Sequence, residues 1–135
     1  MPTFDEFLNR DQFAAANGVE LAEVRPGYAR ARLTVGPQHF NSVGRVHGGA
    51  IFTLAATALF AACCAAGRVV LGINLNITYV QGAEGGILDA EAVEISRSRK
   101  IATCTVRVTN QDQALIAQLQ GTAYITDQPV SQESS

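Results

Sequence analysis

The sequence is poor in charged residues and has no excess of basic ones. Only 16% of its 135 residues are charged, and ten Lys and Arg stand against twelve Asp and Glu, which leaves a net charge of −2. A surface built to hold nucleic acid normally carries a basic excess, so no nucleic-acid partner is expected. Hydrophobic residues make up 47% of the chain, which is enough for the core of a single domain.

Cysteine is also scarce, with only Cys63, Cys64 and Cys104 in the chain. Three cysteines, two of them adjacent, form no disulfide framework, and reduced thiols in an intracellular protein are the simplest interpretation. Ala and Phe surround the adjacent pair and supply nothing that would activate a nucleophile, so core packing is expected there. The first ten residues lack the apolar segment of a secretory signal. Together these features predict a cytoplasmic location.

Motifs for nucleotides, for a hydrolase serine and for metals are missing. The chain contains no GxGxxG, GxxxxGK(S/T) or GxSxG pattern. His39 and His47 are its only histidines, and no CxxC or HExxH accompanies them, so no zinc site is expected. The sequence therefore predicts neither a metal nor a resident cofactor.

A stretch without any formal charge runs over residues 46–67 and reads VHGGAIFTLAATALFAACCAAG. Its length would suffice to cross a bilayer. However, Ala is its commonest residue, a His-Gly-Gly lies near its start, and no aromatic belt flanks it. A helix buried on all sides, which a sheet can approach closely, is the preferred interpretation, and no membrane partner is expected.

Strand patterns occupy most of the remaining chain. Alternation of apolar and polar residues predicts a strand at 28–35, and in residues 69–80 one face is expected to carry Leu71, Ile73, Leu75, Ile77 and Tyr79. Further strands are predicted at residues 87–96, 101–109 and 114–126, with turns at 82–86 and 110–113.

The order of these elements indicates an α+β fold. Thr3 and Glu6 fit a capping box that opens a short helix to Ala16. A single long helix cannot cover both faces of an antiparallel sheet of five to six strands, so it is expected on the concave side of a curved sheet. One domain is predicted over residues 1–127, with a polar, disordered tail at 128–135. Exposed sheet edges predict that a second copy of the chain covers them.

The His47-Gly48-Gly49 segment before the long helix is the most informative chemical feature. The first N–H groups of a helix lack partners within the helix, and the helix dipole places partial positive charge there. Two glycines leave that end bare, so a substrate carbonyl could approach as in an oxyanion site. Asn41 could add a side-chain amide. A glycine-rich loop that merely turns the chain into the helix is the alternative.

These residues resemble a known family. Asn41, Gly44, His47-Gly48-Gly49, Phe52 and Leu54-Ala55, followed by a small-residue helix and the segment Asn76 to Tyr79, are similar to hotdog-fold thioesterases of the phenylacetate-degradation (PaaI-like) type. The resemblance implies a hotdog fold, in which a curved antiparallel sheet wraps a long helix. It also implies a homodimer or a dimer of dimers with active sites between subunits, and hydrolysis of an acyl-CoA thioester. Coenzyme A would then be part of the substrate.

Carried over to this sequence, the resemblance implies that the N–H of Gly48 polarises the thioester carbonyl. Asn41 would help to hold the site and the attacking water. His47 would shape the pocket or make only a structural contact, and Asn74 would orient water or be a solvated strand residue. Further substrate contacts are implied for Gly49, Phe52 and Thr57. The phosphates of coenzyme A could be held by Arg68, Arg97, Arg99 and Lys100, although such a run is more often a solvated strand end.

One departure from the family pattern concerns the catalytic acid. The family carries an acid seven residues after the second glycine of the HGG motif, where this chain has Ala56. Alanine can act neither as a base nor as a nucleophile. Two functions therefore stay open. The first is an acyl-CoA thioesterase, with aryl acyl groups among its candidate substrates, that is natively weak, uses a relocated base, or is a variant with its acid removed. The second is a catalytically impaired hotdog protein that binds acyl-CoA as a sensor or carrier.

Overall fold

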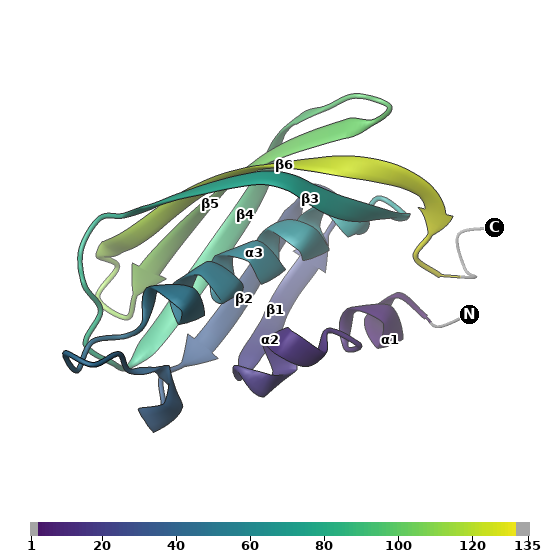
Figure 1. Cartoon of the computed structure of the whole chain (residues 1–135). Coiled ribbons are helices and arrows are strands. Elements are labelled where there is room, and N and C mark those ends of the chain that lie inside the picture. Colours follow the sequence, from purple (N-terminus) through teal and green to yellow (C-terminus); the bar gives the residue numbers. More distant parts are fainter. Residues whose placement is uncertain (1–2, 132–135) are drawn as a thin grey trace.

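Six antiparallel strands curve around one long helix in the computed structural model, which describes residues 3–131 (Figure 1). This arrangement is the α+β hotdog architecture that the sequence predicts. In chain order the elements are α1 (Phe4–Leu8), α2 (Gln12–Ala16), β1 (Val19–Arg25), β2 (Tyr28–Thr34), a 3-10 turn η1 (Pro37–His39), α3 (Gly48–Cys64), β3 (Arg68–Tyr79), β4 (Ile87–Arg97), β5 (Ile101–Asn110) and β6 (Leu115–Pro129).

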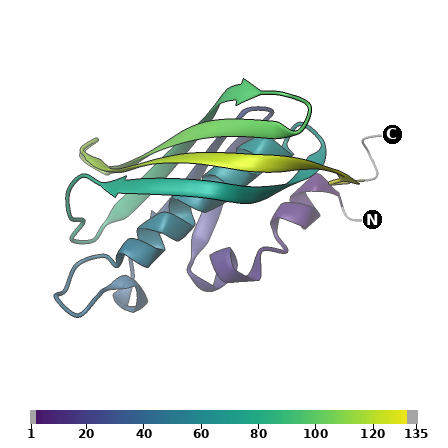
Figure 2. The ribbon, with the colours of Figure 1, turned by 45° about the horizontal axis from the view of Figure 1, so that its top comes forward.

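The sheet has the strand order β1-β2-β4-β5-β6-β3, and every neighbouring pair is antiparallel. β3 follows α3 directly in the chain but pairs only with β6, so it forms one edge of the sheet. Figure 2 shows β3 running beside β6 at this edge. The other edge is β1, next to the N-terminal helices.

Alanine allows α3 to lie close to the sheet. Residues of its inner face, such as Ala55, Ala58 and Ala62, are fully buried, and they face small residues of β2 and β4 such as Ala31 and Ala90. Close approach between small side chains buries the backbone of the helix without leaving voids. The prediction of a helix buried on all sides is wrong for one stripe, because Phe52, Thr53, Ala56, Thr57 and Phe60 are only half-buried. Among residues 3–131, no helix is both long and apolar enough to cross a membrane.

The N-terminal segment forms two short helices rather than the single predicted one. The capping box of α1 is confirmed: the N–H of Glu6 donates to the Thr3 hydroxyl at 3.1 Å, and the N–H of Thr3 donates to the Glu6 carboxylate at 3.2 Å. Asp11 then starts α2, since its Oδ1 accepts the N–H of Ala14 at 2.9 Å. Aspartate favours this capping position over a helix interior, which explains why the helix is interrupted.

β3 departs from the predicted alternation. The pairing with β6 shifts register between Gly72 and Asn74, because a bulge inserts one extra residue and reverses which face follows. Leu71 and Ile73 are therefore 56% and 59% exposed, whereas Leu75 is half-buried on the inner face. The expectation that these residues share one face is wrong.

The end of β6 lies further along the chain than predicted. The strand continues to Pro129, and Val130 is buried and donates its N–H to the Gly67 carbonyl at 3.1 Å. Residues 128–131 are thus ordered rather than part of the predicted tail. The remainder of that tail, residues 132–135, lies outside the described residues.

Candidate active site

The loop before α3 is held by the side chain of Asn41. Its Oδ1 accepts the N–H groups of Val43 at 3.1 Å and Arg45 at 3.0 Å, and its backbone N–H donates to the Arg45 carbonyl at 2.7 Å. Gly44 completes the turn with a φ of 78°, a conformation that favours glycine. The Oδ1 atom therefore organises the loop, which leaves the Asn41 amide NH₂ as the part of the side chain that could reach a substrate.

His47 caps the start of α3. It is extended (φ −62°, ψ 137°), and its Nδ1 accepts the N–H of Gly49 at 2.7 Å. The N–H of His47 is bound in turn to the His39 carbonyl at 2.7 Å. Within residues 3–131 the N–H of Gly48 meets no acceptor, so this donor at the positive end of the helix is open to a ligand.

Tyr79 packs over Gly48 and leaves little room for a side chain there. Its hydroxyl donates to the Gly48 carbonyl at 2.8 Å, and a Cβ on Gly48 would lie only 3.0 Å from the Tyr79 Cζ and hydroxyl oxygen. Partial burial raises the pKa of Tyr79 above its usual value, which keeps the hydroxyl protonated as this donor. The last residue of β3 is thereby tied to the first residue of α3.

A groove of about 380 Å³ lies along the half-buried stripe of α3, between α2, α3 and β3. Its lining is largely apolar and includes three phenyl rings. Within the part of the chain that the structure describes, Asp11 is its one ionisable lining residue. The lining consists of Asp11, Phe13, Ala14, Phe52, Thr53, Ala56, Thr57, Leu59, Phe60, Val70, Gly72 and Leu75.

The hydroxyl hydrogens of the two groove threonines are donated to backbone carbonyls of α3. Thr53 donates to the Gly49 carbonyl at 2.8 Å, and Thr57 donates to the Thr53 carbonyl at 2.7 Å. Their oxygens can still accept a hydrogen bond from a ligand. A threonine hydroxyl cannot serve as a base at neutral pH, so neither residue supplies the acid that the resemblance implies for position 56.

The open N–H of Gly48 and the side chain at position 56 lie at different points along α3. Gly48 and Ala56 are separated by eight residues of α3, which at 1.5 Å per residue is about 12 Å along the axis. Gly48 is also not part of the groove lining. One thioester carbonyl therefore cannot contact both within a single chain.

Comparison with known proteins identifies the family of this chain. The sequence pattern of the thioesterase superfamily matches residues 43–117, which is over half of the chain. The chain belongs to the thioesterase superfamily. A protein of Archaeoglobus fulgidus whose provisional name is esterase is 36% identical over 121 residues, covering 89% of this chain and 79% of that protein.

Two further members of the superfamily bear on the fold. The acyl-coenzyme A thioesterase PaaI of Escherichia coli is 28% identical over 115 residues, which is 84% of this chain and 82% of PaaI. The E. coli PaaI structure superimposes with a TM-score of 0.89 at 25% identity, over 93% of this chain and 91% of that one. A hypothetical thioesterase of Streptococcus pneumoniae, solved with coenzyme A, has the same fold (TM-score 0.84, 21% identity, 93% and 98% coverage).

Phe52, Ala56 and Thr57 lie together in the groove of this superfamily member, whereas Asn74 does not. Asn74 follows the bulge of β3, is exposed, and is not part of the lining. Sequence reasoning missed Asp11 entirely, because nothing in the sequence indicated that α2 would face the middle of α3. The signal that was available is the N-cap preference of Asp11, which would have divided the N-terminal helix in two.

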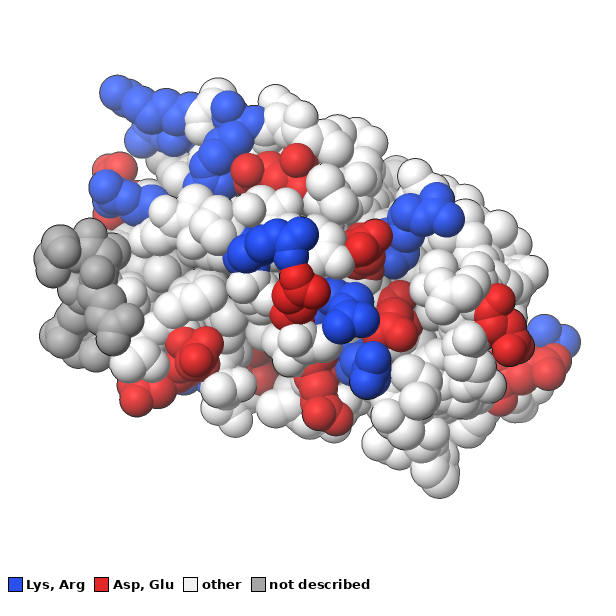
Figure 3. Space-filling view, turned by 180° about the vertical axis from the view of Figure 1, so that it is seen from behind, with Lys and Arg blue, Asp and Glu red and all other residues white. Residues whose placement is uncertain are grey.

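The predicted phosphate-binding residues gather near the C-terminal end of α3. Arg68 opens β3 and donates to the Asp127 carbonyl at 2.6 Å, while Arg97 pairs with Glu94 at 2.5 Å. Lys100 lies 5.6 Å from the centre of the Tyr124 ring, and Arg99 precedes it in the β4–β5 turn. Figure 3 shows Lys and Arg side chains gathered at the upper left, where the β4–β5 hairpin of Figure 1 lies.

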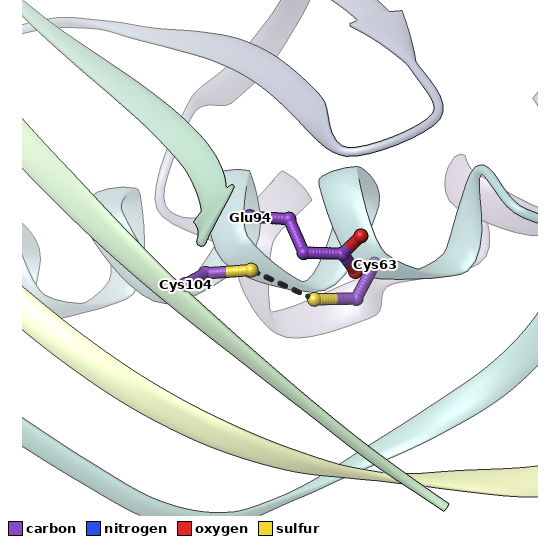
Figure 4. A group of neighbouring side chains, drawn as sticks. All are labelled: Cys63, Glu94 and Cys104. Atoms are coloured by element: carbon purple, nitrogen blue, oxygen red, sulfur yellow. Dashed lines mark hydrogen bonds between the residues drawn. The ribbon is translucent and has the colours of Figure 1, made fainter. Parts of the chain in front are cut away.

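Cys63, Glu94 and Cys104 form a buried cluster that the sequence did not indicate (Figure 4). Their potential metal-binding atoms all lie within 4.8 Å of one another, and the two sulfurs are 3.0 Å apart. Two thiolates on one zinc, each about 2.3 Å from it, would have to separate well beyond this distance. Glu94 is already paired with Arg97. The cluster is therefore arranged for hydrogen-bonded packing, in line with the core role expected for the cysteines.

Proposed function

We propose that this chain hydrolyses the thioester bond of acyl-coenzyme A substrates. The observation that carries the proposal is the open backbone N–H of Gly48 at the start of α3, where two glycines leave no side chain to block a ligand. The same helix also lines an apolar groove. An N–H in this position stabilises the oxyanion that forms when a thioester carbonyl is attacked. The activity named for E. coli PaaI and the coenzyme A in the S. pneumoniae structure support this class of substrate.

The groove along α3 is the proposed acyl site. Phe13, Phe52 and Phe60 supply rings that can stack on an aryl group or pack on an alkyl chain. Its volume of about 380 Å³ lies within the range typical of small-molecule sites. Aryl and medium-length acyl groups are therefore the proposed substrates. Arg68, Arg97, Arg99 and Lys100 are proposed to bind the phosphates of coenzyme A.

A second copy of the chain is proposed to complete the site by pairing along β3. This edge strand exposes Leu71 and Ile73, and an unpaired apolar edge favours association. Two antiparallel β3 strands related by a two-fold axis would place the Tyr79 end of one beside the Gly72 end of the other. Tyr79 is bonded to Gly48, and Gly72 lines the groove. The N–H of Gly48 would thus reach the groove of the neighbouring copy, which resolves the separation of about 12 Å within one chain.

The second candidate function is binding of acyl-CoA without turnover, as a sensor or carrier. Ala56 is the observation that favours it, because an alanine lines the groove at the position where the family resemblance implies a catalytic acid. Both functions use the same groove and the same open N–H. They differ only in whether a base is present to activate water.

The two functions are separated by measuring reaction and binding on the same compounds. Thiol release from a panel of aryl, short-chain and long-chain acyl-CoAs would be followed next to the equilibrium binding of their non-hydrolysable thioether analogues. Thiol release well above the rate in buffer, for ligands that also bind, is expected. Tight binding of the analogues with no thiol release from any acyl-CoA would contradict hydrolysis and support the binding protein.

A further inference from the structure

We infer that Asp11 is the general base of this site and takes the role that Ala56 cannot perform; the inference rests on the proposed thioesterase function. Asp11 and Ala56 come from different elements, α2 and α3, yet line the same groove. Asp11 is the one side chain of that lining, within residues 3–131, that carries a carboxylate. Activation of a water molecule at neutral pH needs such a group within hydrogen-bond reach.

Capping of α2 fixes the carboxylate of Asp11 through one of its two oxygens and leaves the other available. Its Oδ1 accepts the N–H of Ala14 at 2.9 Å, and Ala14 is itself buried and part of the groove lining. The other carboxylate oxygen, Oδ2, receives no hydrogen bond from residues 3–131. A carboxylate held at one oxygen and free at the other is positioned to orient a water molecule and accept its proton.

Other titratable groups near α3 are committed elsewhere. The Nδ1 of His47 accepts the N–H of Gly49, so the proton-free nitrogen of this imidazole is already occupied and cannot take a proton from water. His39 is buried, with its ring nitrogens bonded to the Gly36 N–H and the Asn17 carbonyl at 2.9 and 2.6 Å. Glu94 is paired with Arg97 at the far end of the helix. Glu20 is exposed and lies with Asp11 and Thr57 in an adjoining hollow, outside the groove lining, which leaves Asp11 as the base.

The small side chain at position 56 is consistent with this role. An acid at position 56 would place a second carboxylate in the groove beside Asp11, and two such groups in one site oppose each other's ionisation. Alanine leaves that space to water and substrate. The loss of the acid on α3 and the presence of Asp11 on α2 are thus two aspects of one arrangement.

In the proposed reaction, water is the nucleophile and the coenzyme A thiolate is the leaving group. Asp11 accepts one proton from water while the water oxygen forms a bond to the thioester carbonyl carbon, whose oxygen becomes an oxyanion bound by the N–H of Gly48 from the second copy. Collapse of this intermediate breaks the carbon–sulfur bond. The departing coenzyme A thiolate takes the proton from Asp11, so the carboxylate is regenerated, and the products are a carboxylic acid and free thiol.

The test is the change Asp11→Asn in the full-length chain. Asparagine is as good an N-cap as aspartate, so the variant keeps the bond to Ala14 and loses only the base. The value of kcat is expected to fall about 10²–10⁴-fold, with binding of the thioether analogue within threefold of the wild type. Asp5→Asn in α1 makes the same chemical change outside the groove and should leave kcat unchanged. The wild type is expected to gain kcat/KM with increasing pH on the acidic side of its profile, and this gain should be absent in Asp11→Asn.

A rescue experiment separates a chemical role from a structural one. Adding Ala56→Asp to Asp11→Asn returns a carboxylate to the groove from α3 and should raise kcat at least tenfold over Asp11→Asn alone. An active wild type whose Asp11→Asn variant keeps its kcat and its acidic limb would overturn the role of Asp11 and leave the thioesterase proposal standing. A wild type that releases no thiol from any acyl-CoA would overturn both.

Discussion

The start of α3 and its middle differ in the way each is built. At the start, Asn41 accepts the N–H of Arg45 and His47 accepts the N–H of Gly49 within one short segment, and the N–H of Gly48 is left open. The middle is a groove with few polar groups, assembled from α2, α3 and β3. The first region can bind developing negative charge, whereas the second can hold an acyl group and a carboxylate. On the proposed function these are two parts of one hydrolytic site, and because Gly48 and Ala56 are about 12 Å apart along α3, association of two chains is expected to join them.

The largest loss of activity is expected when two chains are prevented from associating along β3. Ile73→Lys places a charge on the exposed bulge of the β3 edge, where a second chain would pair. The variant should be monomeric by light scattering, with thiol release lowered about 10³-fold because the oxyanion donor of the other copy is removed.

Ile95→Lys is the matched control for the edge. Ile95 is 56% exposed against 59% for Ile73 and also lies at a register shift, but its strand, β4, is interior to the sheet rather than an edge. The Ile95→Lys protein should remain dimeric and active. Equal behaviour of the two variants would show that β3 is not the contact.

Removing only the donor at the helix start should have a somewhat smaller effect. Gly48→Pro eliminates the N–H, and proline suits the first turn of a helix after an extended residue such as His47. Thiol release should fall about 10²-fold while the dimer persists. Gly48→Ala keeps the N–H but adds a Cβ against Tyr79, so it controls for crowding. If Gly48→Ala loses as much activity as Gly48→Pro, the donor is not the cause.

The floor of the groove offers a test through stability. Behind the groove, a Cβ on Gly121 would lie 2.4 Å from a methyl carbon of Leu59 and 3.1 Å from Leu75. Gly121→Ala should lower the free energy of unfolding by about 1–3 kcal/mol through overpacking, as measured by urea denaturation. Because Leu59 and Leu75 line the groove, longer acyl groups should lose more activity than short ones. Unchanged stability would show that the groove floor has room to spare.

The smallest effect concerns the last turn of α3, which lies outside both regions. Burial raises the pKa of Cys64 to about 12, so its thiol stays neutral in the folded chain when the unfolded chain already loses the proton. Stability should be fully present below about pH 9 and decline as the pH rises toward 12, by about 1 kcal/mol at pH 10. Urea midpoints at pH 7.5 and 10 measure this decline, and Cys64→Ala should lack that part of it.

The start of α3 could be predicted from the sequence more fully than the groove at its middle, for a physical reason. The order of elements, the Ala-rich helix and the cap residues around Gly48 follow from short-range patterns in the chain. The groove required knowing that α2 folds back onto α3 and that a bulge at Ile73 reverses the faces of β3. Both depend on packing between segments some 40 to 60 residues apart, which no local pattern encodes. Asp11 therefore was recognisable only as a cap.

The most direct test is to divide the two regions between different chains. Gly48→Pro and Asp11→Asn chains, each nearly inactive as homodimers, would be co-expressed with distinct tags and purified as the mixed dimer. If one copy supplies the N–H and the other the carboxylate, the mixed dimer contains one intact site of two and should recover about half of the wild-type rate of thiol release. A mixed dimer no more active than its two parents would contradict a site shared between chains.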